Sequence, residues 1–142
     1  MSRQIVIDAS AVLATLLRES HAVAILKATA GADLISPASL PYEITNALSG
    51  RMRRSTTDPQ RMTPVQTGQT WELFTRADIT LYPVDKTQHT SALALAGAQG
   101  SYCYDAYLVV LALAKGTALL TLDKALRRMA TAVGVQIVSL GE

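Results

Sequence analysis

The stretch that most constrains this chain is a short run of β-branched residues ending in a carboxylate. Residues 5–8 read Ile-Val-Ile-Asp, and small residues then lead into the apolar stretch 12–17. Such a run is typical of a strand buried on both faces and followed at once by a helix. Strands of this kind lie at the centre of parallel sheets, where chemistry collects beyond the carboxyl ends of the strands. We therefore expect Asp8 at the edge where such a crevice opens.

The rest of the chain alternates between short strands and helices in the same way. Helices are expected over residues 11–18, 21–30, 37–54, 64–76, 87–98, 104–115 and 123–133, and strands over residues 5–8, 33–36, 79–82, 118–122 and 135–140. This alternation predicts an α/β fold with a parallel sheet covered by helices on both faces. Because the 142 residues contain no repeat and no low-complexity tract, we expect a single domain over residues 1–142.

Composition excludes several classes of protein. Hydrophobic residues make up 49% of the chain and charged residues 17%, which excludes an intrinsically disordered protein. Cys103 is the only cysteine, so no intramolecular disulfide is expected and a reducing compartment is favoured. The longest apolar run, residues 107–114, is far shorter than the ~18 residues that a membrane span requires. We expect a cytoplasmic protein with no membrane partner.

Four acidic residues are expected at one edge of the sheet. Asp123 follows the predicted strand before it and opens a helix, just as Asp8 does after the first strand. Glu43 and Asp105 fall in the first turns of two other predicted helices. The carboxyl ends of parallel strands and the beginnings of the following helices share one edge, so the four carboxylates are candidates to converge there.

Helix capping is the alternative explanation for these acids. Asp is a favoured N-cap, and an acid in the first turn gains about 0.3–1 kcal/mol from the helix dipole. Taken singly, Asp8 and Asp123 are explained better by capping than by a functional site. Glu43 and Asp105 fit capping less well, because Glu is not a preferred N-cap and Asp105 lies in an otherwise apolar segment. Both explanations stay open from these residues alone.

A cluster of four carboxylates requires a cation, because like charges repel strongly at low dielectric. Mg²⁺ is typically held by one or two carboxylates together with waters and substrate phosphates. Such a site suits hydrolysis of a phosphodiester. Ser10, Asn46 (one helical turn after Glu43) and Thr121 accompany the acids. They either support a ligand or a water, or are ordinary capping and surface residues.

Other chemistries have weaker signals. The chain has no phosphate-binding loop of the GxxxxGK[ST] type. His21 and His89 stand alone and are expected to face solvent, and Cys103 is expected to be a small core residue. Two groups of basic residues either contact phosphates or form solvated helix faces: Arg51, Arg53, Arg54 and Arg61, and Lys124, Arg127 and Arg128.

Four motifs taken together resemble those of the PIN-domain ribonucleases. They are IVIDAS around Asp8, PYEITNAL around Glu43, YDAYLVVLA around Asp105 and LTLD ending at Asp123, in the order of that family. With its length, the chain looks like a VapC-type toxin of a type II toxin–antitoxin pair. The resemblance implies a three-layer α/β/α sandwich with a mostly parallel sheet. It also implies cleavage of RNA that depends on Mg²⁺ or Mn²⁺.

The same resemblance implies partners and residue roles. The expected partners are the RNA substrate, a cognate antitoxin whose C-terminal segment fills the acidic groove, and a second copy in a homodimer. By motif, Asp8 and Asp105 are the metal ligands, and Glu43 and Asp123 complete the catalytic acids. Ser10 and Thr121 support the site, whereas residues 55–68 match no motif of the family.

Two other functions remain as alternatives. One is a degenerate nuclease fold that binds RNA or protein without cleaving it. The other is a receiver-like phosphotransfer domain with Asp8 as the phosphate acceptor. A receiver usually has an acid pair at the first strand and a Lys at the last, whereas Ala9 and Ser10 follow Asp8 here and residues 135–140 contain no Lys.

Overall fold

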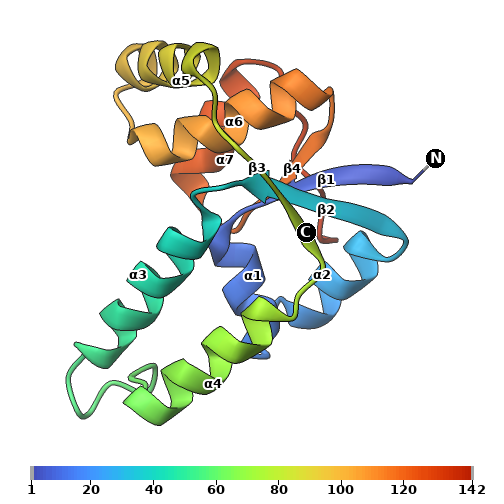
Figure 1. Cartoon of the computed structure of the whole chain (residues 1–142). Coiled ribbons are helices and arrows are strands. Elements are labelled where there is room, and N and C mark those ends of the chain that lie inside the picture. Colours follow the sequence, from blue (N-terminus) through green and yellow to red (C-terminus); the bar gives the residue numbers. More distant parts are fainter. Residues whose placement is uncertain (1, 142) are drawn as a thin grey trace.

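The computed structural model describes residues 2–141, in which strands and helices alternate. Figure 1 shows a sheet through the middle of the molecule with helices above and below it. Within these residues, no helix is both long and apolar enough to cross a lipid bilayer. The elements in chain order are β1 (Arg3–Ile7), α1 (Ala9–Leu16), α2 (Ala22–Thr29), β2 (Ala32–Pro37), α3 (Leu40–Met52), α4 (Pro64–Thr75), β3 (Ile79–Tyr82), α5 (Lys86–Gln99), α6 (Cys103–Lys115), β4 (Ala118–Leu120) and α7 (Lys124–Ala132).

The strands of the described sheet are all parallel, in the order β3-β2-β1-β4. Ile5 of β1 pairs with Leu34 on one side and with Ala118 on the other, so β1 is an interior strand as its sequence predicted. From β1 the chain steps outward to β2 and β3, and it then returns to place β4 on the other side of β1. The order of the strands therefore reverses between β1 and β4. Ligands bind at such reversals in open α/β sheets.

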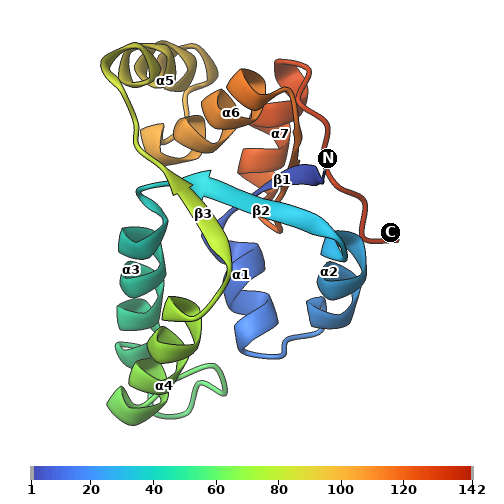
Figure 2. The same ribbon diagram turned by 45° about the vertical axis from the view of Figure 1, so that its right-hand side comes forward.

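Alternate residues of the strands serve two separate cores, because successive side chains of a strand point to opposite faces. Val6 and Leu119 belong to the core covered by α5, α6 and α7. Ile5, Ile7 and Leu120 belong to the core covered by α1 to α4. Figure 2 shows the sheet between these two helical layers. The predicted three-layer α/β/α sandwich is confirmed.

The strand predicted over residues 135–140 is wrong. One parallel bridge joins Ile137 to Leu119, with hydrogen bonds of 2.9 Å from the Leu119 N–H to Gln136 O and from the Val138 N–H to Leu119 O. β4 is only three residues long, so it offers this segment no ladder along which to extend. The segment covers the outer edge of β4 without forming a fifth strand within the described residues.

The helix predicted over residues 37–54 is shorter than predicted. Pro37 continues β2 and pairs with Tyr82 of β3, and the Ala38 N–H donates to Tyr82 O at 2.8 Å. The parallel ladder thus delays the helix until Leu40. Glu43 nevertheless lies in the first helical turn, as its sequence position predicted.

Candidate active site

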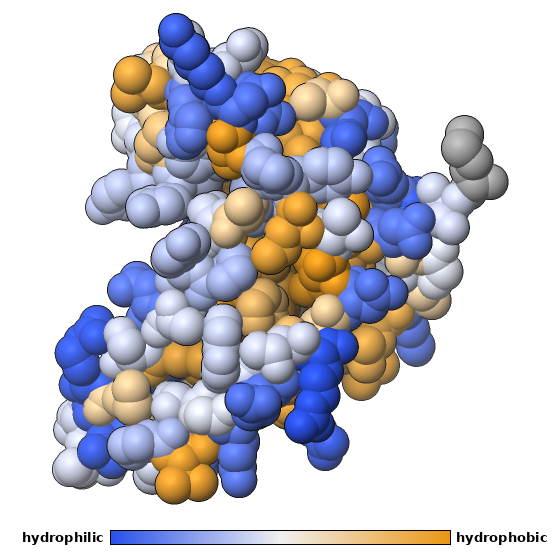
Figure 3. Space-filling view, viewed as in Figure 1, coloured by the Kyte–Doolittle hydropathy of each residue, from blue (hydrophilic) through white to orange (hydrophobic). Residues whose placement is uncertain are grey.

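A pocket of about 600 Å³ opens at the edge of the sheet where β1 and β4 end. It is lined by all four acids that the sequence predicted to converge: Asp8, Glu43, Asp105 and Asp123. Figure 3, drawn from the same side as Figure 1, shows the surface notched between the upper helical layer and α3. The fold therefore brings together carboxylates from four separate segments of the chain.

Asp8 is the most deeply placed of these acids, with 5% of its surface exposed. Ser10 Oγ lies 2.7 and 2.9 Å from its two carboxylate oxygens, and Thr121 Oγ1 donates to Oδ2 at 2.5 Å. The Ala11 N–H donates to Oδ1 at 3.0 Å, which makes Asp8 the N-cap of α1. Burial raises the pKa of Asp8, although the bonds from Thr121, Ala11 and Ser10 oppose this rise. Asp8 is therefore a helix cap and a pocket residue at once.

Ser10 and Thr121 connect Asp8 to the segment that follows β4. The Leu122 N–H donates to Ser10 Oγ at 3.0 Å, and the Asp123 N–H donates to Thr121 Oγ1 at the same distance. Thr121 is fully buried, and its hydroxyl is fixed by the Asp8 carboxylate and the Asp123 N–H. The two hydroxyls thus join the end of β1 to the segment after β4, next to the pocket that Ser10 lines.

Glu43 enters the pocket from the first turn of α3. The Ser39 hydroxyl donates to its Oε2 at 3.2 Å. Burial raises the pKa of Glu43 to about 7, and the charges of Asp8 and Asp105 contribute to the rise. Asn46 lies one helical turn later, exposed at the rim of the same pocket.

Asp105 and Asp123 belong to the helical layer on the other face of the sheet. Asp105 lies half-buried in the first turn of α6. Its pKa is raised to about 6, mainly by burial and to a smaller extent by the charges of Asp123 and Asp8. Asp123 is the exposed N-cap of α7, and its Oδ1 accepts the N–H groups of Ala125 and Leu126 at 2.8 and 3.1 Å. The charge of Asp123 thus adds to the effect of burial on Asp105, which places the two carboxylates on the same side of the pocket.

The donor set of this pocket fits a hard divalent cation. The ion pairs found among residues 2–141, Arg51–Glu19 and Arg54–Asp58, involve none of the pocket acids. Carboxylate oxygens are the ligands that Mg²⁺ and Mn²⁺ prefer. No three acidic, His or Cys side chains of the described chain lie close enough together to enclose a metal by themselves. Mg²⁺ keeps several of its waters and needs only one or two carboxylates, so the pocket suits a partly hydrated ion.

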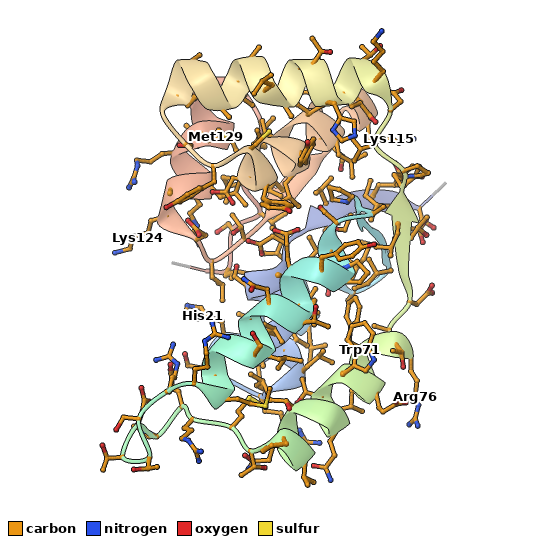
Figure 4. The ribbon with its side chains drawn as sticks, turned by 60° about the vertical axis from the view of Figure 1, so that its left-hand side comes forward. His21, Trp71, Arg76, Lys115, Lys124 and Met129 are labelled. Atoms are coloured by element: carbon orange, nitrogen blue, oxygen red, sulfur yellow. The ribbon has the colours of Figure 1, made fainter. Side chains whose placement is uncertain are left out.

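The histidines, the cysteine and Lys124, which the sequence did not assign to the acidic site, do not line the pocket. His21 and His89 are exposed as predicted, and His89 Nδ1 lies 2.7 Å from the Tyr107 hydroxyl. Cys103 is partly buried against the core at the beginning of α6. Lys124 points outward from the beginning of α7 (Figure 4).

Three aromatic residues of this site were not predicted from the sequence. Tyr42, Tyr102 and Tyr104 line the pocket together with the acids. The available signal was their position in the motifs, because Tyr42 precedes Glu43 and Tyr104 precedes Asp105. A tyrosine beside an apolar helical segment is more often a core residue, so this signal carries weight only once exposure is known.

Comparison with known proteins agrees with this architecture. Among the solved structures that share the fold, PAE2754 from Pyrobaculum aerophilum has 20% identity and a TM-score of 0.64, and the match covers 96% of this chain and 84% of that chain. VapBC2 from Rickettsia felis bound to a DNA fragment from their promoter has 11% identity and a TM-score of 0.63, and the match covers 94% of this chain and 96% of that chain. FitAcB from Neisseria gonorrhoeae has 15% identity and a TM-score of 0.58, and the match covers 96% of this chain and 97% of that chain. No curated protein matches the sequence. The model of the PIN domain family matches residues 5–132, and this chain therefore belongs to the PIN domain family.

Proposed function

We propose that this protein is a metal-dependent endoribonuclease that cleaves RNA phosphodiester bonds at the acidic pocket. The observation that carries the proposal is the convergence of Asp8, Glu43, Asp105 and Asp123 at the reversal point of the sheet. PIN domains are generally nucleases. Because the chain belongs to this family, the alternative of a receiver-like phosphotransfer domain is dropped. A pocket lined by four carboxylates and by no His or Cys of the described residues is suited to metal-assisted hydrolysis.

Asp8 and Asp105 are the residues that we assign to hold Mg²⁺ or Mn²⁺, with Glu43 and Asp123 completing the acidic site. A bound metal neutralises charge on the scissile phosphate and lowers the pKa of a water. Glu43, whose pKa is about 7, is placed to accept and return a proton near neutral pH. Ser10 and Thr121 fix the orientation of the Asp8 carboxylate, and the Asn46 amide offers a donor and an acceptor at the rim.

The biological role that we propose is that of the toxin in a type II toxin–antitoxin pair. Support comes from the fold that the chain shares with VapBC2 and FitAcB over nearly the whole length of those chains. The expected protein partners are a cognate antitoxin, whose C-terminal segment occupies the acidic pocket, and a second copy of the chain. The expected location is the cytoplasm.

The test compares two N-cap substitutions that differ in one respect. Asp8→Asn and Asp85→Asn both replace the N-cap Asp of a helix with Asn, an equally good cap, but only Asp8 lines the pocket. In Mn²⁺, wild type and Asp85→Asn should cleave RNA, whereas Asp8→Asn should lose activity by orders of magnitude. Excess EDTA should abolish all cleavage. Cleavage that persists undiminished in EDTA contradicts the proposal.

Thermal unfolding of the same proteins supplies a readout independent of activity. A ligand present at a hundredfold excess over its Kd stabilises the folded state by about 2.7 kcal/mol. Mn²⁺ should therefore raise the Tm of wild type and Asp85→Asn by about 10 °C for a chain of this size, and that of Asp8→Asn much less. Equal Mn²⁺-induced shifts in all three proteins would mean that Asp8 is a helix cap alone.

A further inference from the structure

Three exposed tyrosines surround the mouth of the acidic pocket. Tyr42, Tyr102 and Tyr104 expose 75%, 82% and 59% of their surface. The whole chain contains five Tyr, one Trp and one Phe, so three of its seven aromatic residues border this one pocket. Rings exposed to this degree contribute little to the core, and exposed apolar surface gathered at one place marks a binding site.

The three rings come from both walls of the pocket. Tyr42 lies on α3, next to Glu43, whereas Tyr104 lies on α6, next to Asp105. Tyr102 is the N-cap residue of α6 but makes no capping bond with its side chain. Each wall therefore presents an acid and an aromatic ring side by side.

The Tyr104 ring is held in place by its neighbours. It meets the Tyr107 ring edge to face, with centroids 6.4 Å apart and planes at 66°. Tyr107 is in turn fixed by His89, through a T-shaped ring contact at 5.2 Å and the hydrogen bond between its hydroxyl and Nδ1. A ring oriented before the ligand arrives loses less conformational entropy on binding.

We propose that Tyr42, Tyr102 and Tyr104 stack on unpaired bases of the RNA, beside the phosphodiester placed among the carboxylates. This inference rests on the proposed function. Stacking on an aromatic side chain contributes about 1–3 kcal/mol per base and tolerates any base, because every base has a π face. In a duplex the bases stack on one another, so their faces are not available to the rings.

The charge of the pocket gives a second reason for this assignment. The carboxylates repel the phosphates of RNA unless a cation compensates them, and attraction by uncharged groups does not depend on that compensation. The tyrosine rings supply such attraction at the rim, on both sides of the acids.

The test is a binding measurement with a defined probe. Fluorescein-labelled 12-nucleotide oligo(U) RNA is titrated with protein in Ca²⁺, which occupies oxygen sites, and the probe is verified as intact afterwards. Each Tyr→Leu variant should bind about 5- to 150-fold more weakly, the range that corresponds to 1–3 kcal/mol. Each Tyr→Phe variant should bind like wild type because it keeps the ring. Leu93→Ala is the matched control, since Leu93 is 70% exposed on α5 and does not line the pocket.

An abasic probe makes the test specific to base stacking. Moving one abasic site along the oligonucleotide should reveal positions where wild type loses affinity. At such a position the same abasic site should weaken a Tyr→Leu variant by a smaller factor, because the partner of the base has already been removed. All variants should keep the Tm of wild type and the same salt dependence of binding, since no phosphate contact is changed.

Several results would overturn the inference. The first is unchanged RNA affinity in all three Leu variants. The second is equal affinity of wild type for oligo(U) and for its duplex with oligo(A). The third is that the Leu variants lose affinity for an antitoxin but keep their affinity for RNA. The proposed function fails separately, if wild type does not cleave RNA in Mn²⁺. The tyrosine assignment alone fails if wild type cleaves RNA and the Leu variants bind and cleave it equally well.

Discussion

Glu43→Gln provides a test of the electrostatics of the pocket that needs no substrate. Burial, with the charges of Asp8 and Asp105, raises the pKa of Glu43 from 4.5 to about 7. A carboxyl with a higher pKa in the folded chain than in the unfolded chain binds more protons when folded between those two values. The free energy of unfolding therefore falls as the pH rises from about 4.5 to about 7. The stabilisation is complete below about pH 4.5 and is lost above about pH 7.

The size of this effect follows from the pKa change. A rise from 4.5 to about 7 corresponds to about 3 kcal/mol for a group shielded from water. Glu43 is only partly buried and solvent screens its charge, so we expect about 1–2 kcal/mol. The Gln side chain carries no charge but keeps an oxygen that can accept the hydrogen bond from Ser39. The substitution therefore removes the pH-dependent component and retains the contact.

Urea unfolding at pH 5.0 and pH 7.5 in EDTA measures the effect. The free energy of unfolding of wild type should fall between the two pH values by about 1–2 kcal/mol more than that of Glu43→Gln. Glu72→Gln is the control, because Glu72 is an exposed acid on α4, and it should follow wild type. If wild type and Glu43→Gln lose the same free energy between pH 5.0 and 7.5, the reasoning about the pocket is refuted.

Three further predictions concern the supporting residues and the assembly. Thr121→Val should lower the free energy of unfolding by about 1–3 kcal/mol in urea, because it removes the buried hydroxyl that donates to Asp8 and accepts from the Asp123 N–H, whereas Thr121→Ser should not. Asp123→Asn should keep the stability of wild type and lose nuclease activity, whereas Asp123→Ala should also lose about 1 kcal/mol with the cap; full activity of Asp123→Asn would remove Asp123 from the catalytic acids. Light scattering at micromolar concentration should give twice the mass of one chain, and a monomer mass would count against the homodimer.

The parts of the fold that were predicted from sequence rest on local signals. The run of β-branched residues before Asp8 and the apolar run before Asp123 each encode a buried strand and the beginning of a helix within a few residues. Parallel pairing then places both aspartates at the same edge. Convergence of these acids could be predicted because parallel strands place their carboxyl ends at one edge of the sheet, even when the strands are far apart in the sequence.

The parts that could not be predicted depend on length and exposure. Residues 135–140 have the composition of a strand, but strand formation requires a partner, and β4 ends after three residues. In the same way, Tyr42 and Tyr104 follow patterns that suit a core helix as well as a pocket rim. Only the packing of α3 and α6 against the sheet decides which side of each helix is covered.

Capping and function are competing explanations for Asp8 and Asp123 when only the sequence is considered, but the structure shows that both residues cap a helix and line the pocket. A parallel α/β fold places helix beginnings at the carboxyl ends of strands, so the residue that caps a helix there also borders the crevice. At Asp123 both capping bonds go to Oδ1, so the cap itself does not require Oδ2. A carboxylate can therefore be fixed by backbone N–H groups and still face a ligand.

Caps outside the pocket differ in how their own N–H group is satisfied. Asp85 and Thr63 form capping boxes, in which the cap N–H donates to a Gln side chain three residues later. The Asp8 N–H instead donates to Leu120 O of the neighbouring strand, and the Asp123 N–H donates to Thr121 Oγ1.

The residue three positions after the capping Asp differs between the two kinds of cap. Because the sheet or Thr121 satisfies their N–H groups, Asp8 and Asp123 need no Gln three residues later, and the residues found there are Ala11 and Leu126, both buried. In this chain, the two aspartates that follow an apolar strand and precede an apolar residue by three positions are both caps at the sheet edge. That pattern separates Asp8 and Asp123, which border the pocket, from Asp85, which does not.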